Sequence, residues 1–556
     1  WGRAHSAALS GVVSGLFAIS VVLALAVFGA RWLSSEAEAE RAAAAGLRLL
    51  ELADQAERAR IDDPDHAVAL LRGYAQEAAW TGTPAVAEAW ARCGKLLEDL
   101  DRQSEAADAW AASYAAALEP LAQDQALRGL GSSFAAAEDW EPLRQVVDLM
   151  TARNPAVSAD PRVAWWKAQA ALGGRDLSLA ASVLRDAALP GAALVGTLST
   201  STPMPSVSGW VRNADVDRDG IDDVWGATAD GRITRWEGGS SWEWTLPRPP
   251  LDPREVFPIA GDPPLVLTRH LGGAAALYEA RPDRAGPLDP PVFVWPEEQL
   301  MSAVAGDVDR DGDWEVWIGV GPYGRRLVTL APRRGWHVES RLPSVDAAES
   351  DVDALAIADV DGDGKTELVA ALGPWSAYDL RVFRSGARGM ETVAREKLGH
   401  ISALVPVDGA VWALKTSGFP SRVVFPAQEP SGVSPGAYRM VLDPATAAGP
   451  PEWRVDRMLP ASRPLSPHSG PLFVADLDGN GVDDVVWVTE GTTVIWADGD
   501  PVRPPLTLGG MAARGVLEMD GDPARELLVE LLPEGRMAAL GAGAEPVPPA
   551  SRPVTG

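Results

Sequence analysis

The sequence predicts a multidomain fold: a transmembrane helix, an α-helical repeat region and an all-β propeller of seven blades. Three observations predict it: an uncharged apolar stretch near the start, an alanine-rich region with helical periodicity, and an acidic loop that recurs before strand-like segments. The expected boundaries are 1–34 for the anchor, 35–190 for the helical repeats, 191–204 for a linker, 205–545 for the propeller and 546–556 for a C-terminal tail.

Length, charge and cysteine content narrow the class of protein. A chain of 556 residues with 46% hydrophobic residues is long enough for about three domains with packed cores. The formal net charge of −28 argues against a nucleic-acid partner, because the phosphate backbone would be repelled. The single cysteine, Cys93, excludes an intrachain disulfide.

The anchor is predicted from residues 6–30, which contain no charged side chain. A helix of this length spans about 37 Å, enough to cross a hydrocarbon core of roughly 30 Å with some tilt. Arg3 and Arg31 border the stretch, and Trp1 and Trp32 lie where interfacial aromatic residues are favoured. We therefore expect a single-pass transmembrane helix, with a cleaved signal peptide and a buried helix as the alternatives.

The region 35–190 is rich in alanine, poor in β-branched residues and periodic in the manner of helices. Two segments share one spacing of large, small and aromatic residues: Trp90-x-x-Cys93-Gly94-x-x-Leu97 before Ala106 and Trp110, and Leu127-x-x-Leu130-Gly131-x-x-Phe134 before Val147. This spacing resembles the tetratricopeptide repeat, in which small residues let paired helices approach closely. Alanine-rich helical hairpins of no family are the alternative, and either arrangement would present a concave face.

The acidic loop Asp-x-Asp-x-Asp-Gly-x-x-Asp/Glu occurs five times, the last copy in degenerate form. Closely spaced carboxylates repel one another unless a cation lies among them, and hard oxygen ligands at this density suit Ca²⁺. We expect about four to five calcium ions, since metal-free acidic turns do not account for five copies in register. The candidate metal ligands are Asp215, Asp217, Asp219, Asp223, Asp307, Asp309, Asp311, Glu315, Asp359, Asp361, Asp363, Glu367, Asp476, Asp478, Asn480, Asp484, Glu518, Asp520, Asp522 and Glu526.

The loop is not an EF-hand, because its last acid stands at position 9 instead of position 12 and a strand-like segment follows it. The copies begin at residues 215, 307, 359, 476 and 518, so they are 92, 52, 117 and 42 residues apart. Two of these intervals are about twice as long as the others. Degenerate copies at 259–267 and 405–414 fill them and give seven units, a spacing that is typical of propeller blades.

The loops and their spacing resemble the FG-GAP repeats of integrin α-subunit propellers and the related bacterial VCBS-type repeats, over about residues 205–545. The resemblance implies that calcium sits between the first two strands of a blade and braces that hairpin. It also implies that each loop's acids bind one ion, as Asp215, Asp217, Asp219 and Asp223 would in the first copy. Pro523 replaces the turn glycine in the last copy, which departs from the pattern.

Charge around the apolar stretch gives little guidance on membrane orientation, since Arg3 precedes it while Arg31, Arg41 and Arg48 follow. The expected membrane orientation rests instead on the acidic loops, because such sites fill readily at the millimolar Ca²⁺ concentration found outside cells. We expect the C-terminal domains to be extracytoplasmic, in the periplasm or at the cell surface.

No catalytic set is recognisable: the six histidines are scattered and no zinc-protease motif occurs. We therefore expect a non-enzymatic binding or scaffold protein, with a protein or glycan ligand on the propeller or the helical repeat face. Two alternatives stay open. One is the sensory ectodomain of a larger bacterial membrane protein, such as a Ser/Thr kinase whose catalytic domain precedes Trp1, and the other is a propeller polysaccharide lyase.

Overall fold

The computed structural model describes residues 35–541, except for 190, 199–200, 204–209, 218–222, 238–239, 272, 297–298, 322–325, 333–334, 344–350, 374–377, 387–388, 417–431, 445–449, 462–464, 467–469 and 519–522. The predicted anchor (1–34) and tail (546–556) lie outside the described residues. Within the described part of the chain, no helix combines the length and the apolar character that a membrane crossing requires. The chain divides into two compact units, residues 1–170 and 171–556, which are described separately.

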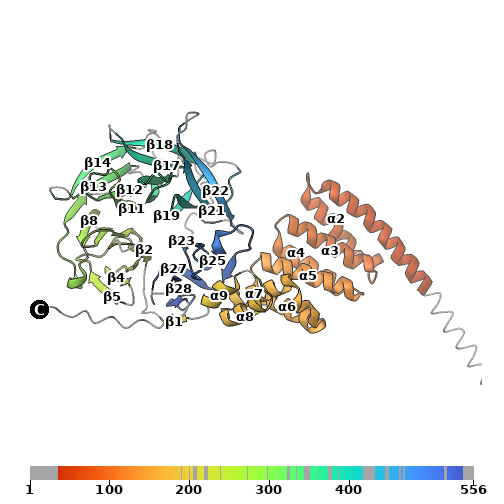
Figure 1. Ribbon diagram of the computed structural model, residues 1–556. Coiled ribbons are helices and arrows are strands. Elements are labelled where there is room, and N and C mark those ends of the chain that lie inside the picture. Colours follow the sequence, from red (N-terminus) through yellow and green to blue (C-terminus); the bar gives the residue numbers. More distant parts are fainter. Residues whose placement is uncertain are drawn as a thin grey trace, which may run out of the picture. The chain divides into compact units, whose positions relative to one another are not determined.

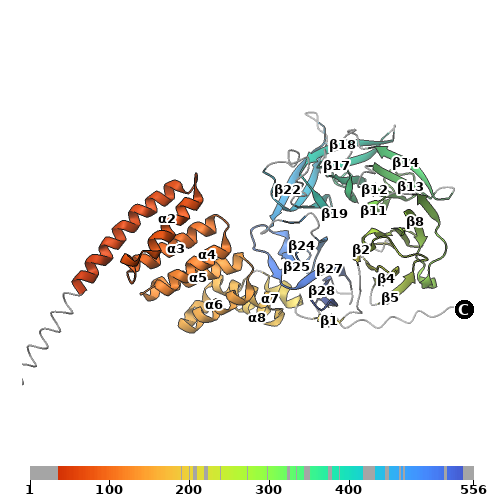
Figure 2. The same ribbon diagram turned by 180° about the vertical axis from the view of Figure 1, so that it is seen from behind.

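The first unit is all-helical, as predicted, and its helices stack beside one another in sequence order (Figure 2). Its elements are a helix over residues 35–59, α2 (Pro64–Gln76), η1 (Ala78–Trp80), α3 (Pro84–Asp99), α4 (Gln103–Ala116), α5 (Pro120–Ala136), α6 (Trp140–Arg153), η2 (Pro155–Ala159) and most of α7 (Pro161–Gly173). Proline at the first position of α2, α3 and α5 costs no hydrogen bond, because that N–H has no partner within the helix.

Close approach between helices depends on glycine at the contacts. The indole of Trp110, on α4, packs against Gly94 of α3 and Gly129 of α5, and its Nε1 donates to Glu98 Oε1 at 3.0 Å. A Cβ atom added at Gly129 would lie 2.2 Å from Trp110 Cδ2, well inside van der Waals contact. Gly94 of the predicted repeat spacing therefore does make room for a large residue on the neighbouring helix, and so does Gly129, which that spacing did not include.

The second unit is a seven-bladed β-propeller that begins with two helices, α8 (Leu177–Asp186) and α9 (Ala192–Leu198). Figure 1 shows the sheets in a ring, with β11 and β19 toward the centre and β14, β18 and β22 outside. Blade 1 is β2 (Trp210–Ala214), β3 (Asp223–Ala227), β4 (Arg232–Glu237) and β5 (Ser240–Thr245), extended by β9 (Gly286–Pro287). Blade 2 is β6 (Val256–Ile259), β7 (Leu265–Arg269), β8 (Ala274–Glu279) and β10 (Phe293–Pro296).

Blades 3 to 5 are regular antiparallel meanders. Blade 3 is β11 (Leu300–Gly306), β12 (Glu315–Val320), β13 (Arg326–Ala331) and β14 (His337–Pro343). Blade 4 is β15 (Val352–Ala358), β16 (Glu367–Leu372), β17 (Asp379–Gly386) and β18 (Gly389–Lys397). Blade 5 is β19 (Ile401–Val407), β20 (Ala410–Lys415), β21 (Gly436–Asp443) and β22 (Glu452–Pro460).

The last two blades complete the ring, and blade 7 takes one strand from the start of the unit. Blade 6 is β23 (Leu472–Ala475), β24 (Asp484–Thr489), β25 (Thr492–Trp496) and β26 (Leu506–Leu508). Blade 7 is β27 (Met511–Leu517), β28 (Glu526–Leu531), β29 (Arg536–Leu540) and β1 (Ser201–Pro203). Short helical turns η3 (Pro253–Glu255), η4 (Pro282–Arg284) and η5 (Ala497–Gly499) lie in the connections.

The seven blades confirm the predicted number, and both degenerate copies fall where they were predicted, on the β6–β7 and β19–β20 hairpins. Every residue of β12, β16, β20 and β24 is buried. This happens because each sheet stacks on its neighbours: Trp317 of β12 packs in one cluster with Leu368 of β16. Because both faces of these strands are buried, their sequences are continuous apolar runs and do not alternate between apolar and polar residues.

The expected linker at 191–204 is wrong. Residues 192–198 form α9, with Leu194, Val195 and Leu198 buried, and residues 201–203 form β1, which pairs antiparallel with β29 from Ser201↔Leu540 to Pro203↔Ala538. Thr197 Oγ1 also lies 3.2 Å from the Leu477 carbonyl oxygen of blade 6. The helices α8 and α9 thus belong to the propeller unit and not, as the boundary at 190 implied, to the helical repeats.

The packing of Trp110 generates a stability prediction. Gly129→Ala should destabilise the helical unit by about 1–3 kcal/mol, because the methyl group collides with the indole ring. Gly73→Ala is the matched control, since nothing lies within 4 Å of its added Cβ. In the control, alanine should stabilise α2 by about 0.5–1 kcal/mol through its helix propensity. Thermal unfolding followed by circular dichroism measures both, and equal effects of the two substitutions would contradict the packing.

Candidate metal centres

The five acidic loops occupy the same corner of five blades. Each joins the first strand of its blade to the second: β2 to β3, β11 to β12, β15 to β16, β23 to β24 and β27 to β28. The last acid of every loop is the first residue of that second strand and is buried. These five buried carboxylates are Asp223, Glu315, Glu367, Asp484 and Glu526.

Three of the loops share a backbone conformation that wraps the chain around the first aspartate. Asp307 Oδ1 accepts from Asp311 N at 3.0 Å, and its Oδ2 accepts from Gly312 N at 3.1 Å. The equivalent bonds run to Asp359 from Asp363 N (3.1 Å) and Gly364 N (2.8 Å), and to Asp476 from Asn480 N (3.0 Å) and Gly481 N (2.7 Å). The glycine at position 6 has φ of +91°, +79° and +83° in these loops, a conformation that side chains disfavour.

The side chains of these three loops converge. In each, the candidate ligand atoms lie within 4.8 Å of one another, as oxygens that surround one Ca²⁺ at roughly 2.3–2.6 Å must. Three acidic clusters among the described residues therefore fit a metal ion. They are Asp307, Asp309, Asp311 and Glu315; Asp359, Asp361 and Glu367; and Asp476, Asp478 and Asp484.

Six of the predicted carboxylate ligands that the structure describes lie outside these clusters: Asp215, Asp217, Asp223, Asp363, Glu518 and Glu526. Asp363 forms an ion pair with Lys365 Nζ at 3.1 Å. The predicted amide ligand Asn480, in the loop of blade 6, donates from Nδ2 to Asp498 Oδ1 at 2.9 Å. Three further predicted ligands, Asp219, Asp520 and Asp522, lie outside the described residues.

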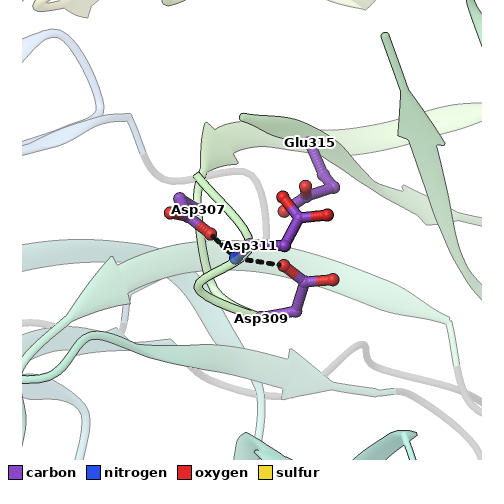
Figure 3. Close-up of side chains that lie close together, drawn as sticks. All are labelled: Asp307, Asp309, Asp311 and Glu315. Carbon is purple, nitrogen blue, oxygen red and sulfur yellow. Dashed lines mark hydrogen bonds between the residues drawn. The ribbon is translucent and has the colours of Figure 1, made fainter. Parts of the chain in front are cut away.

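In the loop of blade 3, a buried glutamate lies close to three aspartates. Figure 3 shows Glu315 reaching from the start of β12 toward the Asp311 carboxylate. Glu315 is only 2% exposed, and its Oε2 has no hydrogen-bond partner. Burial, reinforced by the charges of Asp309, Asp311 and Asp307, raises the pKa of Glu315 to about 8. A divalent cation among these four residues would supply the missing partner and favour the ionised carboxylate.

In the loop of blade 6, the buried carboxylate of Asp484 accepts hydrogen bonds from two backbone N–H groups. Asp484 Oδ2 accepts from Leu477 N at 2.9 Å, and its Oδ1 accepts from Asp498 N at 2.8 Å. Burial nevertheless raises the pKa of Asp484 to about 7, and the charges of Asp478 and Asp498 add to the effect. Asp498 is a further carboxylate beside this cluster, and it forms an ion pair with Arg503.

Arginines approach the other three loops, and sequence reasoning missed them. In blade 1, Arg235 of β4 contacts Asp217 and Asp223. In blade 4, Arg384 of β17 lies 2.7 Å from Asp361 and 2.9 Å from Glu367. In blade 7, Arg525 Nη1 lies 2.9 Å from Glu518 Oε2. Arg235 and Arg384 come from third strands that follow the loops, so only strand register could have indicated them.

Comparisons with known proteins add no family assignment. No family model matches the chain, and no curated protein matches it. Among solved structures it is similar to the Cps50 (Swd1) β-propeller domain of Myceliophteria thermophila, at 13% identity and a TM-score of 0.40, covering 62% of this chain and 100% of that chain. It is also similar to BBS1N, solved in complex with ARL6DN and soaked with lead, at 14% identity and a TM-score of 0.38. The match covers 62% of this chain and 96% of that chain. It is also similar to the Dos1 propeller, at 12% identity and a TM-score of 0.37, covering 60% of this chain and 83% of that chain.

The buried glutamate of blade 3 predicts an unusual pH dependence. Without metal, the folded-state pKa of Glu315 is about 8, against an ordinary value of 4.5, so the folded state holds an extra proton between these values. Stability should then fall as pH rises from 5 to 8, by up to about 1.4 kcal/mol per pH unit from this group. Glu315→Gln should flatten this slope, as measured by urea unfolding in chelator.

The matched control is Glu339→Gln, an exposed glutamate in the same blade, which should leave the slope unchanged. Saturating calcium should also reduce the wild-type slope, because the bound ion favours the ionised carboxylate. Identical slopes for wild type and Glu315→Gln in chelator would contradict the assignment of this group.

Proposed function

We propose that this chain is a non-enzymatic binding scaffold whose propeller is braced by calcium and faces an extracytoplasmic, calcium-rich compartment. The observation that carries the proposal is the recurrence of one acidic cluster at the same hairpin of blades 3, 4 and 6. In blade 3, the buried Oε2 of Glu315 has no hydrogen-bond partner. A site repeated between the same two strands of several blades suits a structural metal site better than an active site, because catalysis needs one centre and not several copies.

Calcium suits these clusters better than magnesium. Ca²⁺ accepts 6–8 oxygen ligands in flexible geometry, whereas Mg²⁺ demands near-octahedral geometry and keeps several waters. The blade 3 loop offers four carboxylates around one point. The recurrence of the acidic loop at the same hairpin supports membership of the FG-GAP and VCBS-type propellers. The packing of Trp110 against Gly94 supports tetratricopeptide-like pairing in the helical unit.

A structural role for the buried histidines supports the non-enzymatic part of the proposal. His270 Nε2 lies 2.5 Å from Tyr278 Oη, and both side chains are buried. His400 Nδ1 lies 2.5 Å from Thr416 Oγ1, and its Nε2 lies 3.4 Å from Asp353 Oδ2. The second set joins blade 4 to blade 5, and because Thr416 is fully buried, it presents no nucleophile to solvent.

A ligand has two surfaces available in this proposal, the propeller and the helical repeats. The helical unit has a groove of about 270 Å³ whose lining includes Asp65, Arg72, Gln76 and Arg102. Charges of both signs in one groove suit a polar peptide or a glycan. A single-pass helix over residues 6–30 would hold both units at the membrane.

Calcium removal tests the brace. Each filled site should stabilise the propeller by about 2.7 kcal/mol when free calcium is 100 times the dissociation constant. Chelation should therefore lower the melting temperature of the full chain by about 5 °C or more. Differential scanning calorimetry with calcium, with chelator and with magnesium as the ion control measures this. An unchanged melting temperature in all three would contradict calcium binding.

The compartment is tested by thiol labelling. The only cysteine, Cys93, is fully buried in the helical unit, and burial raises the pKa of its thiol, so it should react slowly. Asp289→Cys introduces one exposed thiol in the propeller, at the modest cost of a surface ion pair with Arg284. A membrane-impermeant maleimide should label this variant in intact cells and leave the wild type unlabelled. Labelling that requires lysis would contradict an extracytoplasmic propeller.

A further inference from the structure

We propose that Arg212, in the middle of β2, binds a carboxylate group of a ligand through the free edge of its guanidinium. Figure 1 shows β2 nearer the centre of the ring than β4 and β5, and β2 is the first strand in the order β2-β3-β4-β5-β9. The proposal rests on the binding role proposed for the propeller and deepens it, because it names the chemistry of the ligand. It involves none of the acidic loops.

Backbone carbonyl groups at the start of blade 2 hold one edge of the guanidinium. Arg212 Nε donates to the Val256 carbonyl oxygen at 3.1 Å, and its Nη2 donates to the Arg254 carbonyl oxygen at 2.7 Å. A guanidinium carries five N–H groups in a rigid planar fork, so these two bonds leave the edge formed by Nη1 and Nη2 unused. Among the described residues, none accepts a hydrogen bond from Nη1. Arg212 is half-buried, so a group from solvent can approach this edge.

Two aromatic rings fix the plane of the guanidinium. Its carbon lies 4.1 Å from the ring centroid of Phe257 and 5.7 Å from that of Trp210, within the range of cation–π attraction. Phe257 follows Val256 on β6, so one short segment supplies both a ring and a carbonyl group. Because its plane and one edge are already fixed, the guanidinium loses little conformational entropy when a ligand binds to its other edge.

The charge of Arg212 has no carboxylate partner among the residues that the structure describes. The two acids in the segment that it contacts each pair with another arginine. Asp252 Oδ2 lies 2.6 Å from Arg254 Nη2, and Glu255 Oε2 lies 2.6 Å from Arg269 Nε. The carbonyl oxygens that Arg212 contacts accept hydrogen bonds but carry no net charge, so its positive charge is not neutralised.

Another arginine of the same blade shows the contrast. Arg235 lies within 3 Å of three carboxylates, those of Asp217, Asp223 and Glu237. Burial lowers the pKa of Arg212 to about 10, so this group is still charged at neutral pH. A carboxylate from a ligand would supply the missing opposite charge, and charge-assisted hydrogen bonds are roughly twice as strong as neutral ones.

A carboxylate fits this site better than other anions. The parallel N–H groups of a guanidinium edge match the two oxygens of a carboxylate. One arginine supplies one charge, whereas a polyanion such as a nucleic acid or a sulfated glycan would be repelled by a chain with a formal net charge of −28. The carboxylate belongs either to a small free acid or to an aspartate or glutamate side chain of a partner protein.

Saturation-transfer NMR on the full chain tests the site with two pairs of probes. Acetate is compared with acetamide, and the peptide acetyl-Gly-Glu-Gly-amide with the same peptide that has glutamine in place of glutamate. At least one carboxylate probe should bind, and its neutral analogue should not. Binding of acetate assigns a free acid as a source, and binding of the glutamate peptide alone assigns a protein side chain. A wild-type chain that binds neither carboxylate probe would overturn this proposal, while the calcium dependence of the melting temperature would still support the proposed function.

Substitutions locate the binding at Arg212. Arg212→Gln should weaken binding of the carboxylate probe by about tenfold or more, because it removes a charged hydrogen-bond donor. Arg232→Gln is the matched control and should leave the affinity unchanged, since it removes the same charge from an exposed arginine of blade 1 that pairs with Asp230. Arg212→Lys keeps the charge without the planar fork and should also bind more weakly, and it decides the matter if circular dichroism shows that Arg212→Gln is unfolded. Equal weakening by Arg212→Gln and Arg232→Gln, or full affinity in Arg212→Lys, would contradict the proposal.

Discussion

The propeller depends on how it neutralises a carboxylate at the buried start of a strand. In five of its seven blades the second strand begins with Asp or Glu, and that residue is buried because the strand lies between neighbouring sheets. A buried charge without a partner costs several kcal/mol, so each of these positions requires a compensating group. Much of the chemistry of the five loops follows from that one requirement.

The groups around this carboxylate differ from blade to blade. Arg235 lies beside Asp223 in blade 1, two backbone N–H groups donate to Asp484 in blade 6, and Glu315 lies among three aspartates in blade 3. The loops of blades 3, 4 and 6 share one backbone conformation, so the sequence repeat is regular there while the electrostatics differ from blade to blade.

Helix packing and ring closure depend on other contacts, between a large side chain and glycine in the first case and between two strands in the second. In the helical unit, Gly94 and Gly129 accommodate Trp110. In the propeller, β1 completes the last blade by pairing with β29, so the ring is closed by backbone hydrogen bonds between segments more than 300 residues apart in the chain. The edge of this blade is therefore β1, a strand of three residues, and such a short edge offers little backbone for pairing with other chains.

The sequence by itself determined the class of each unit, the number of blades and the hairpins that carry the acidic loops. These features follow from local patterns: helical periodicity, apolar runs after turns, and carboxylates at alternate positions. The strand β1 could not be predicted within residues 191–204, because its pairing with β29 is a long-range contact that leaves no local pattern. Only the tertiary structure decided which acids converge and which meet an arginine. Arg235 reaches Asp223 through the register of β4 on β3 and is held there by burial, and a single sequence encodes neither of these locally.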